Sequence, residues 1–163
     1  MKKFIVISIL LGFGLMITLN SCKKKEEETT PATLTSTATI KGKVWAVLDA
    51  TNATEEYAPS GTKIIVTITT QDLVDYTLDA EKIKTLSYET TLDGSGNYSI
   101  SIPATSKIFT AKVNGVDFEY EQTVWDYTTT PTSTKKERKV YTVGQSIVNI
   151  QAGTVQINDL GYN

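Results

Sequence analysis

Side chains that could carry out chemistry are scarce in this sequence. The 163 residues contain no histidine and a single cysteine, Cys22. Without histidine, neither a Ser-His-Asp nor a Cys-His nucleophile can be activated, and a histidine-based zinc site cannot form. Apart from Cys22 the chain has no thiol for a disulfide or for catalysis. We therefore predict that the protein is not an enzyme and that it holds no metal ion.

Two patterns of carboxylates remain as candidate sites. Asp117, Glu119 and Glu121 alternate along one predicted strand and therefore share a face. Glycosidases need two carboxylates that converge across a cleft about 5 to 10 Å wide, which a ladder along one strand does not provide. Residues 93–97 (Asp-Gly-Ser-Gly-Asn) place oxygen ligands at alternate positions but include one carboxylate, which favours a tight turn over a calcium loop. Both patterns predict solvated surface.

The region before Cys22 has the pattern of an export signal. Lys2 and Lys3 precede an apolar or small-residue run over residues 4–19. This run is short for a transmembrane helix, which needs about 20 apolar residues, and it suits the hydrophobic part of a signal peptide. The alternative is an uncleaved signal anchor with an incidental cysteine.

This region ends with Leu19, Asn20, Ser21 and Cys22. The four residues resemble the lipobox of bacterial lipoproteins. The resemblance implies that a signal peptidase recognises the first three residues and removes residues 1–21. It also implies that Cys22 carries covalent diacylglycerol and an N-acyl lipid such as palmitate, with no other cofactor. Several acyl chains on one residue anchor a protein firmly to a membrane.

Residues 22–37 predict a lipidated flexible tether. They are rich in threonine and poor in large apolar side chains, so they cannot bury enough surface to fold. Glu26, Glu27 and Glu28 resemble the surface-export signal of some Gram-negative lipoproteins, and the alternative is a solvated spacer. The inner-membrane retention signal of other Gram-negative lipoproteins has an aspartate directly after the lipidated cysteine. This chain has Lys23 at that position, which argues against retention in the inner membrane. We therefore expect an outer membrane lipoprotein of a Gram-negative bacterium, with cell-surface exposure if the acidic run is an export signal.

The charge distribution argues against nucleic acid as a partner. Removal of residues 1–21 takes away Lys2 and Lys3 and changes the formal net charge from −2 to −4. The downstream basic cluster over residues 135–139 (Lys-Lys-Glu-Arg-Lys) contains a glutamate and follows a Thr-rich segment. It therefore predicts a solvated loop rather than a phosphate-binding patch, and we expect no nucleic acid partner.

Residues 38–163 have the pattern of an all-β domain. Short β-branched stretches alternate between apolar and polar residues and are bounded by turn residues. The predicted strands cover residues 38–47, 62–70, 85–92, 98–103, 108–113, 118–125, 139–143 and 146–157. Residues 71–84 predict an irregular crossover with some helix. We therefore predict a single antiparallel β-sandwich of seven or eight strands.

Four segments of this domain form a familiar arrangement. They are residues 40–44 (Ile-Lys-Gly-Lys-Val), the loop and strand at 58–66, the Gly-rich turn and strand at 93–100, and the closing pair at 148–160. Together they resemble the transthyretin-like sandwiches related to the regulatory domain of metallocarboxypeptidases, which have an Ig-like architecture. The insertion at 127–139 departs from that family. The resemblance implies a non-catalytic module.

Aromatic side chains are the remaining candidates for binding. Trp125 and Tyr127 lie at the start of the Thr-rich insertion and are the best candidates for exposure and for a ligand platform, with burial in the sandwich as the alternative. Two functions remain open. One is an interaction or structural module that binds an envelope protein partner, and the other is a module that binds carbohydrate or another ligand. A pilin-like assembly subunit that adds a strand at an open edge is a third alternative.

Replacing Cys22 with alanine should release the protein from membranes or change its location, because the lipid anchor cannot be attached. Cell fractionation followed by detection of the protein in the membrane pellet measures this. Unchanged membrane retention would show that the apolar run, and not a lipid on Cys22, is the anchor.

Overall fold

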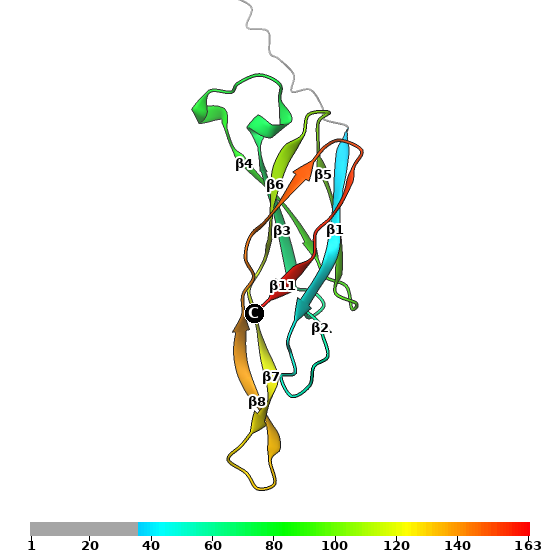
Figure 1. The fold of residues 1–163 in the computed structure, drawn as a ribbon. Coiled ribbons are helices and arrows are strands. Elements are labelled where there is room, and N and C mark those ends of the chain that lie inside the picture. The colour runs from blue at the N-terminus through cyan, green and yellow to red at the C-terminus, as the bar shows by residue number, and fades with distance from the viewer. Residues whose placement is uncertain (1–35) are drawn as a thin grey trace, which may run out of the picture. The chain divides into compact units, whose positions relative to one another are not determined.

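Eleven strands and two short 3-10 helices make up residues 36–163, the part of the chain that the computed structural model describes. The strands are β1 Thr37–Ala46, β2 Glu56–Tyr57, β3 Lys63–Thr69, β4 Thr85–Thr91, β5 Asn97–Pro103, β6 Phe109–Gly115, β7 Phe118–Asp126, β8 Ser133–Tyr141, β9 Ser146–Ile150, β10 Val155–Ile157 and β11 Leu160–Tyr162 (Figure 1). The helices are η1 Thr70–Leu73 and η2 Ala80–Lys82. The predicted signal peptide, lipidation site and acidic export signal lie outside the described residues.

Two sheets and a separate two-stranded ribbon organise these strands. The first sheet has the order β4-β3-β6-β9, and all its neighbours are antiparallel. The second sheet is built around β1, which pairs with β5 and β2 along one edge and with β10 and β11 along the other. The ribbon consists of β7 and β8. The predicted all-β sandwich is confirmed.

Apolar side chains at alternate strand positions form a core shared by the two sheets. Ile40 and Val44 of β1 and Ile64 and Val66 of β3 are fully buried. Successive side chains of a strand point to opposite faces, so the polar residues between them face water. Each fully buried Ile or Val stabilises the fold by about 1.5–3 kcal/mol relative to an exposed one. The period-two pattern of the sequence thus sets which face of each sheet is buried.

β1 also makes parallel pairs, which the antiparallel prediction did not include. β10 and β11 both run parallel to it. Parallel neighbours need a long connection, and the chain from β2 to β9 supplies one. Asn158 and Asp159 separate the two short strands, so β10 pairs with the first part of this edge of β1 and β11 pairs with the second part. At this break the backbone N–H of Lys43 donates to the Asp159 carboxylate at 2.7 Å, which replaces a ladder bond.

β8 occupies residues that the sequence predicts as a Thr-rich loop. Its sequence, STKKERKVY, has weak intrinsic strand propensity, but pairing with β7 over nine residue pairs overrides that preference. The basic cluster at 135–139 therefore lies on a strand and not in a loop. The strand predicted over 146–157 is also interrupted, because a turn with Gly153 at φ 78° separates β9 from β10. The irregular crossover at 71–84 contains η1 and η2.

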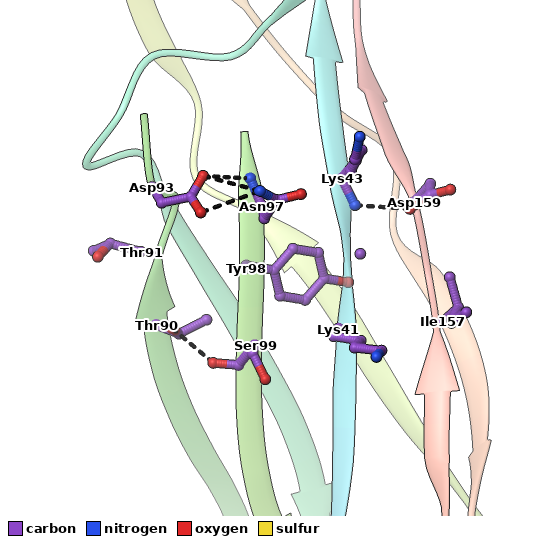
Figure 2. A pocket seen from close by; sticks show the side chains of 11 residues that line it. Lys41, Lys43, Thr90, Thr91, Asp93, Asn97, Tyr98, Ser99, Ile157 and Asp159 are labelled. Carbon is purple, nitrogen blue, oxygen red and sulfur yellow. Dashed lines mark hydrogen bonds between the residues drawn. The ribbon is translucent and has the colours of Figure 1, made fainter. Parts of the chain in front are cut away.

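Gly42 and Asn158 lie in very close contact where β10 gives way to β11. A Cβ atom on Gly42 would lie 2.0 Å from the carbonyl oxygen of Asn158. Tyr98 lies opposite Gly42 in the register of β1 and β5, and its hydroxyl donates to that same oxygen at 2.6 Å. Figure 2 shows the Tyr98 ring reaching from β5 across to β1. An aromatic side chain thus covers the glycine, as in paired strands where a ring fills the space a missing side chain leaves.

Asn158 is buried, and each of its polar groups has a partner. Its backbone N–H donates to the carbonyl of Lys41 at 2.9 Å. Its side-chain amide donates to the Tyr98 hydroxyl at 3.2 Å and accepts from the Ser146 hydroxyl at 2.6 Å. Since a buried polar group without a partner costs about 1–3 kcal/mol, this satisfied network fixes where the chain breaks between β10 and β11.

Replacing Gly42 with alanine should lower the free energy of unfolding by about 3 kcal/mol, because the new Cβ has to displace the Asn158 backbone. Gly161→Ala is the matched control, since no atom lies within 4 Å of a Cβ built there. It should change the free energy of unfolding by less than about 0.5 kcal/mol. Urea denaturation of the two purified variants measures both values. Equal stability of the variants would refute the close contact.

Candidate functional site

The β7–β8 hairpin extends away from the two sheets (Figure 1). Nine residue pairs connect its strands, from Phe118 opposite Tyr141 to Asp126 opposite Ser133. The turn at its tip is held by the Asp126 carboxylate, which accepts from the backbone N–H of Thr128 at 2.9 Å and from its hydroxyl at 2.6 Å. These bonds hold the pKa of Asp126 below its usual value. The tip is therefore an ordered turn.

Aromatic packing holds the base of the hairpin. Tyr141 is fully buried and stacks on Phe118 with ring centroids 5.0 Å apart, while Tyr162 of β11 meets Phe118 edge-on at 4.8 Å. The Tyr141 hydroxyl donates to the carbonyl of Val47, and the Tyr162 hydroxyl donates to the carbonyl of Val116 at 2.8 Å. A two-stranded hairpin alone is marginal in water, so these contacts are what allows it to project.

A second support comes from the loop that follows β1. The backbone N–H of Thr123 donates to the carbonyl of Leu48 at 3.0 Å, and its carbonyl accepts from Ala50 at 2.8 Å. The side-chain amide of Gln122 donates to the carbonyl of Val47 at 2.7 Å. The outer edge of β7 is therefore partly covered by the main sandwich.

Opposite charges face each other across the hairpin. Glu121 of β7 lies opposite Arg138 of β8, and Arg138 forms an ion pair with Glu119. The Lys136 ammonium donates to the Thr123 hydroxyl at 2.6 Å. These exposed contacts contribute about 0–1 kcal/mol each. The predicted carboxylate ladder thus lies on an exposed face beside basic side chains, an arrangement that does not provide two converging acids.

A shallow hollow of about 460 Å³ lies on the hairpin. It is lined by Glu119, Tyr120, Glu121, Lys136 and Arg138. The sequence predicts no such surface, because residues 127–139 have the composition of a loop. The alternation of acids in 117–121 and the bases in 135–139 was the signal that could have paired the two segments.

The predicted aromatic platform lies at the tip of the hairpin. Trp125 is 42% exposed near the end of β7, and Tyr127 is 79% exposed in the turn. Neither side chain lines the grooves at the hairpin or over β1. The structure therefore places both residues on a projecting surface and not in a cavity.

A groove of about 660 Å³ lies over β1 and β5 (Figure 2). Its lining includes Lys41, Lys43, Thr90, Thr91, Asp93, Asn97, Ser99, Ile157 and Asp159. The sequence places Lys41 and Lys43 on the outward face of the first strand but gives no sign of a groove, because the wall formed by Thr90, Thr91 and Asp93 comes from β4 and the turn after it.

The carboxylates at this groove serve the fold. Asp93 accepts from the backbone N–H groups of Asn97 at 2.9 Å and Ser95 at 2.8 Å, and these bonds with the Asn97 amide hold its pKa below the usual value. Gly96 in the same turn has φ 69°. The segment 93–97 is therefore a turn whose carboxylate is occupied by its own backbone. In the part of the chain that the structure describes, no group of three acidic side chains lies close enough to hold a metal ion.

The predicted lipidation site Cys22, its recognition residues 19–21 and the acidic run 26–28 lie outside residues 36–163. Within residues 36–163, no helix has the length and hydropathy needed to cross a membrane. The anchor therefore stays a prediction from the sequence.

No family model and no curated protein matches this chain. Among solved structures, the crystal structure of the major plantain pollen allergen Pla l 1 is similar to it at 14% sequence identity and a TM-score of 0.34, over 78% of this chain and 95% of that chain. A likeness at that TM-score supports no inference. The relation to transthyretin-like sandwiches stays a prediction.

The pH dependence of stability tests the packing at the base of the hairpin. Burial, with a smaller effect of the Asp117 charge, raises the pKa of Tyr162 to about 12. An unfolded tyrosine titrates near pH 10, so between pH 10 and 12 the unfolded state loses a proton that the folded state keeps. The free energy of unfolding should fall over this range by up to about 1.4 kcal/mol per pH unit because of Tyr162.

The variant Tyr162→Phe should show a smaller fall between pH 10 and 12. Tyr98 and Tyr141 also have raised pKa values because they are buried, and their effect persists in the variant. The difference between the two slopes, from urea denaturation at several pH values, isolates Tyr162. Parallel slopes would mean that this hydroxyl is not buried against the hairpin.

Proposed function

We propose that this protein is a non-catalytic lipoprotein of the cell envelope whose β-sandwich is an interaction module, with the β7–β8 hairpin as its contact element. The observation that carries the proposal is the hairpin itself. It projects from the sandwich, most of its side chains are exposed, and its tip presents Trp125 and Tyr127. Aromatic residues on a rigid support are the side chains that most often dominate protein interfaces.

The chemistry of the chain supports a binding role over a catalytic one. The protein has no histidine, and the acids of the hairpin lie on an exposed face where Glu119 is paired with Arg138. The carboxylate of Asp93 is held by its own turn. Tight turns and paired charges of this kind orient a surface and do not supply an acid or base for proton transfer.

The anchor and tether give this module its location. The lipobox-like residues 19–22 place a lipid on Cys22, and the polar residues between Cys22 and β1 link it to the sandwich. An envelope protein within reach of the tether is then the partner that the proposal requires, because anchoring raises the effective concentration of the module at the membrane.

Carbohydrate binding is the second candidate function. Exposure of Trp125 and Tyr127 favours it, since flat aromatic faces with a polar edge stack on sugar rings. The two functions predict different occupants of the same tip, a protein or a polysaccharide.

A photo-crosslinking amino acid in place of Tyr127 should yield an adduct of defined mass in intact cells, because this side chain is the most exposed aromatic at the tip. The same amino acid in place of Tyr76, which is 67% exposed far along the chain from the hairpin, is the matched control and should yield none. Combining Trp125→Ala with the photo-crosslinking amino acid at position 127 should reduce the yield of the adduct by about ten-fold.

The adduct also separates the two candidate functions. Peptides of a second protein in a tryptic digest of the shifted band, with no effect of glycosidases on the band, identify a protein partner and support the proposal. A shifted band that glycosidases return to the mass of the protein alone identifies a polysaccharide and favours the second function. Equal labelling at positions 127 and 76 would mean that the hairpin tip is not a specific contact surface.

A further inference from the structure

The outer edge of β8 has open backbone hydrogen-bonding groups. Within residues 36–163, β8 pairs with β7 alone. The direction of its free groups follows from Thr123 of β7, whose N–H and carbonyl both bond to the loop at Leu48 and Ala50. In an antiparallel ladder the N–H and carbonyl of one residue point to the same side, so Thr123 points away from its partner Lys136. Lys136 must then direct its own N–H and carbonyl outward.

The alternation of the ladder extends this result along the strand. Thr134, Arg138 and Val140 have the same parity as Lys136, so their backbone groups also point outward. Thr142, the next residue of this parity, confirms the direction. Its N–H and carbonyl pair reciprocally with the carbonyl and N–H of Asn163 at 3.2 and 3.0 Å. This edge therefore already accepts a strand-like partner at one end and is open from Thr134 to Val140.

The side chains along the open edge are mainly basic. β8 carries Lys135, Lys136, Arg138 and Lys139 against one acid, Glu137. Lys136 and Arg138 share a face with Val140, which is 54% exposed. A second copy of β8 would bring like charges together, which is unfavourable across a strand pair. Glu121 and Glu119, which is already paired with Arg138, lie on β7 on the inner side of these cations. The strand at the open edge is still the basic one, so its charge favours an acidic partner.

We propose that the outer edge of β8 binds an extended, acidic peptide segment of another protein by antiparallel strand addition, the geometry of the reciprocal pair that Thr142 already forms with Asn163. Glutamate or aspartate side chains of the segment face Lys136 and Arg138, and their backbone N–H groups bond to the outward carbonyls of β8. This inference rests on the proposed role of the hairpin as the contact element and names the kind of partner that it binds. Basic residues on an edge strand can instead serve to keep other strands away, which is the outcome that the experiment must distinguish.

The probe is a fluorescein-labelled ten-residue peptide of alternating Glu and Thr, titrated by anisotropy against the full-length protein purified in detergent. Two further peptides have the same sequence and charge and differ only in N-methylation, on every Glu in one and on every Thr in the other. In an antiparallel pair, a Glu that faces Lys136 directs its N–H toward β8. N-methylation of the Glu residues should therefore weaken binding at least ten-fold, while N-methylation of the Thr residues should leave it within about two-fold.

Protein variants supply the matching test of charge. Lys136→Thr with Arg138→Thr removes two cations and keeps residues of high strand propensity, so the hairpin should remain paired. Binding of the unmodified peptide should fall about ten-fold. Lys107→Thr with Lys112→Thr removes two exposed lysines that lie outside the hairpin and should leave binding unchanged.

Three results would overturn the inference. Equal binding of both N-methylated peptides would show that charge alone attracts the peptide. Equal loss in both pairs of protein variants would mean that no particular edge is used. Absence of binding by any peptide would mean that the lysines of β8 protect the edge; an adduct at position 127 in cells would then still support the hairpin as a contact element, so the two proposals fail separately.

Discussion

The contact between Gly42 and Asn158 determines how β1 can hold partners along both of its edges. Because Gly42 has no side chain, the chain after β10 can turn inward, place Asn158 in the core and leave again as β11. Tyr98 fills the space above the glycine and hydrogen-bonds to the Asn158 carbonyl. A side chain at position 42 would separate β1 from this break, and both parallel pairings depend on it.

The hairpin depends on the same contact through Tyr162. This residue belongs to β11, and its ring packs against Phe118 at the start of β7. The position of β11 relative to β1 therefore decides whether the hairpin has an aromatic base. The other contacts of the hairpin are exposed ion pairs, the bond between Lys136 and Thr123, and the bonds of Gln122 and Thr123 to the loop after β1. Exposed ion pairs contribute little. Packing at the base and solvation of the far end explain how a two-stranded ribbon can project and still be ordered.

The sequence predicts the sandwich well where local pattern decides the structure. Ile64, Val66 and Ile68 alternate with polar residues, and all three are buried in β3. The local pattern does not predict burial where the partners of a residue are distant in the sequence. Nothing near Asn158 in the chain indicates that it is buried, because its partners Tyr98 and Lys41 are far away in sequence. Their place beside a polar turn made Trp125 and Tyr127 candidates for exposure, and the structure shows that both are exposed. The open edge of β8 required the register with Thr123, which only the folded chain provides.

The pairing of β1 with β10 and β11 also has a consequence for the time course of folding. The bond between Lys43 and Asp159 joins residues 116 positions apart, so the second edge of β1 closes only after nearly the whole domain is available. Folds dominated by such distant contacts fold in milliseconds to seconds, more slowly than helical bundles of similar size. Until β10 and β11 pair with β1, this strand exposes a long unpaired edge and apolar side chains such as Ile40 and Val44, which are buried in the folded domain. During this interval the emerging chain is most exposed to aggregation and most in need of a chaperone.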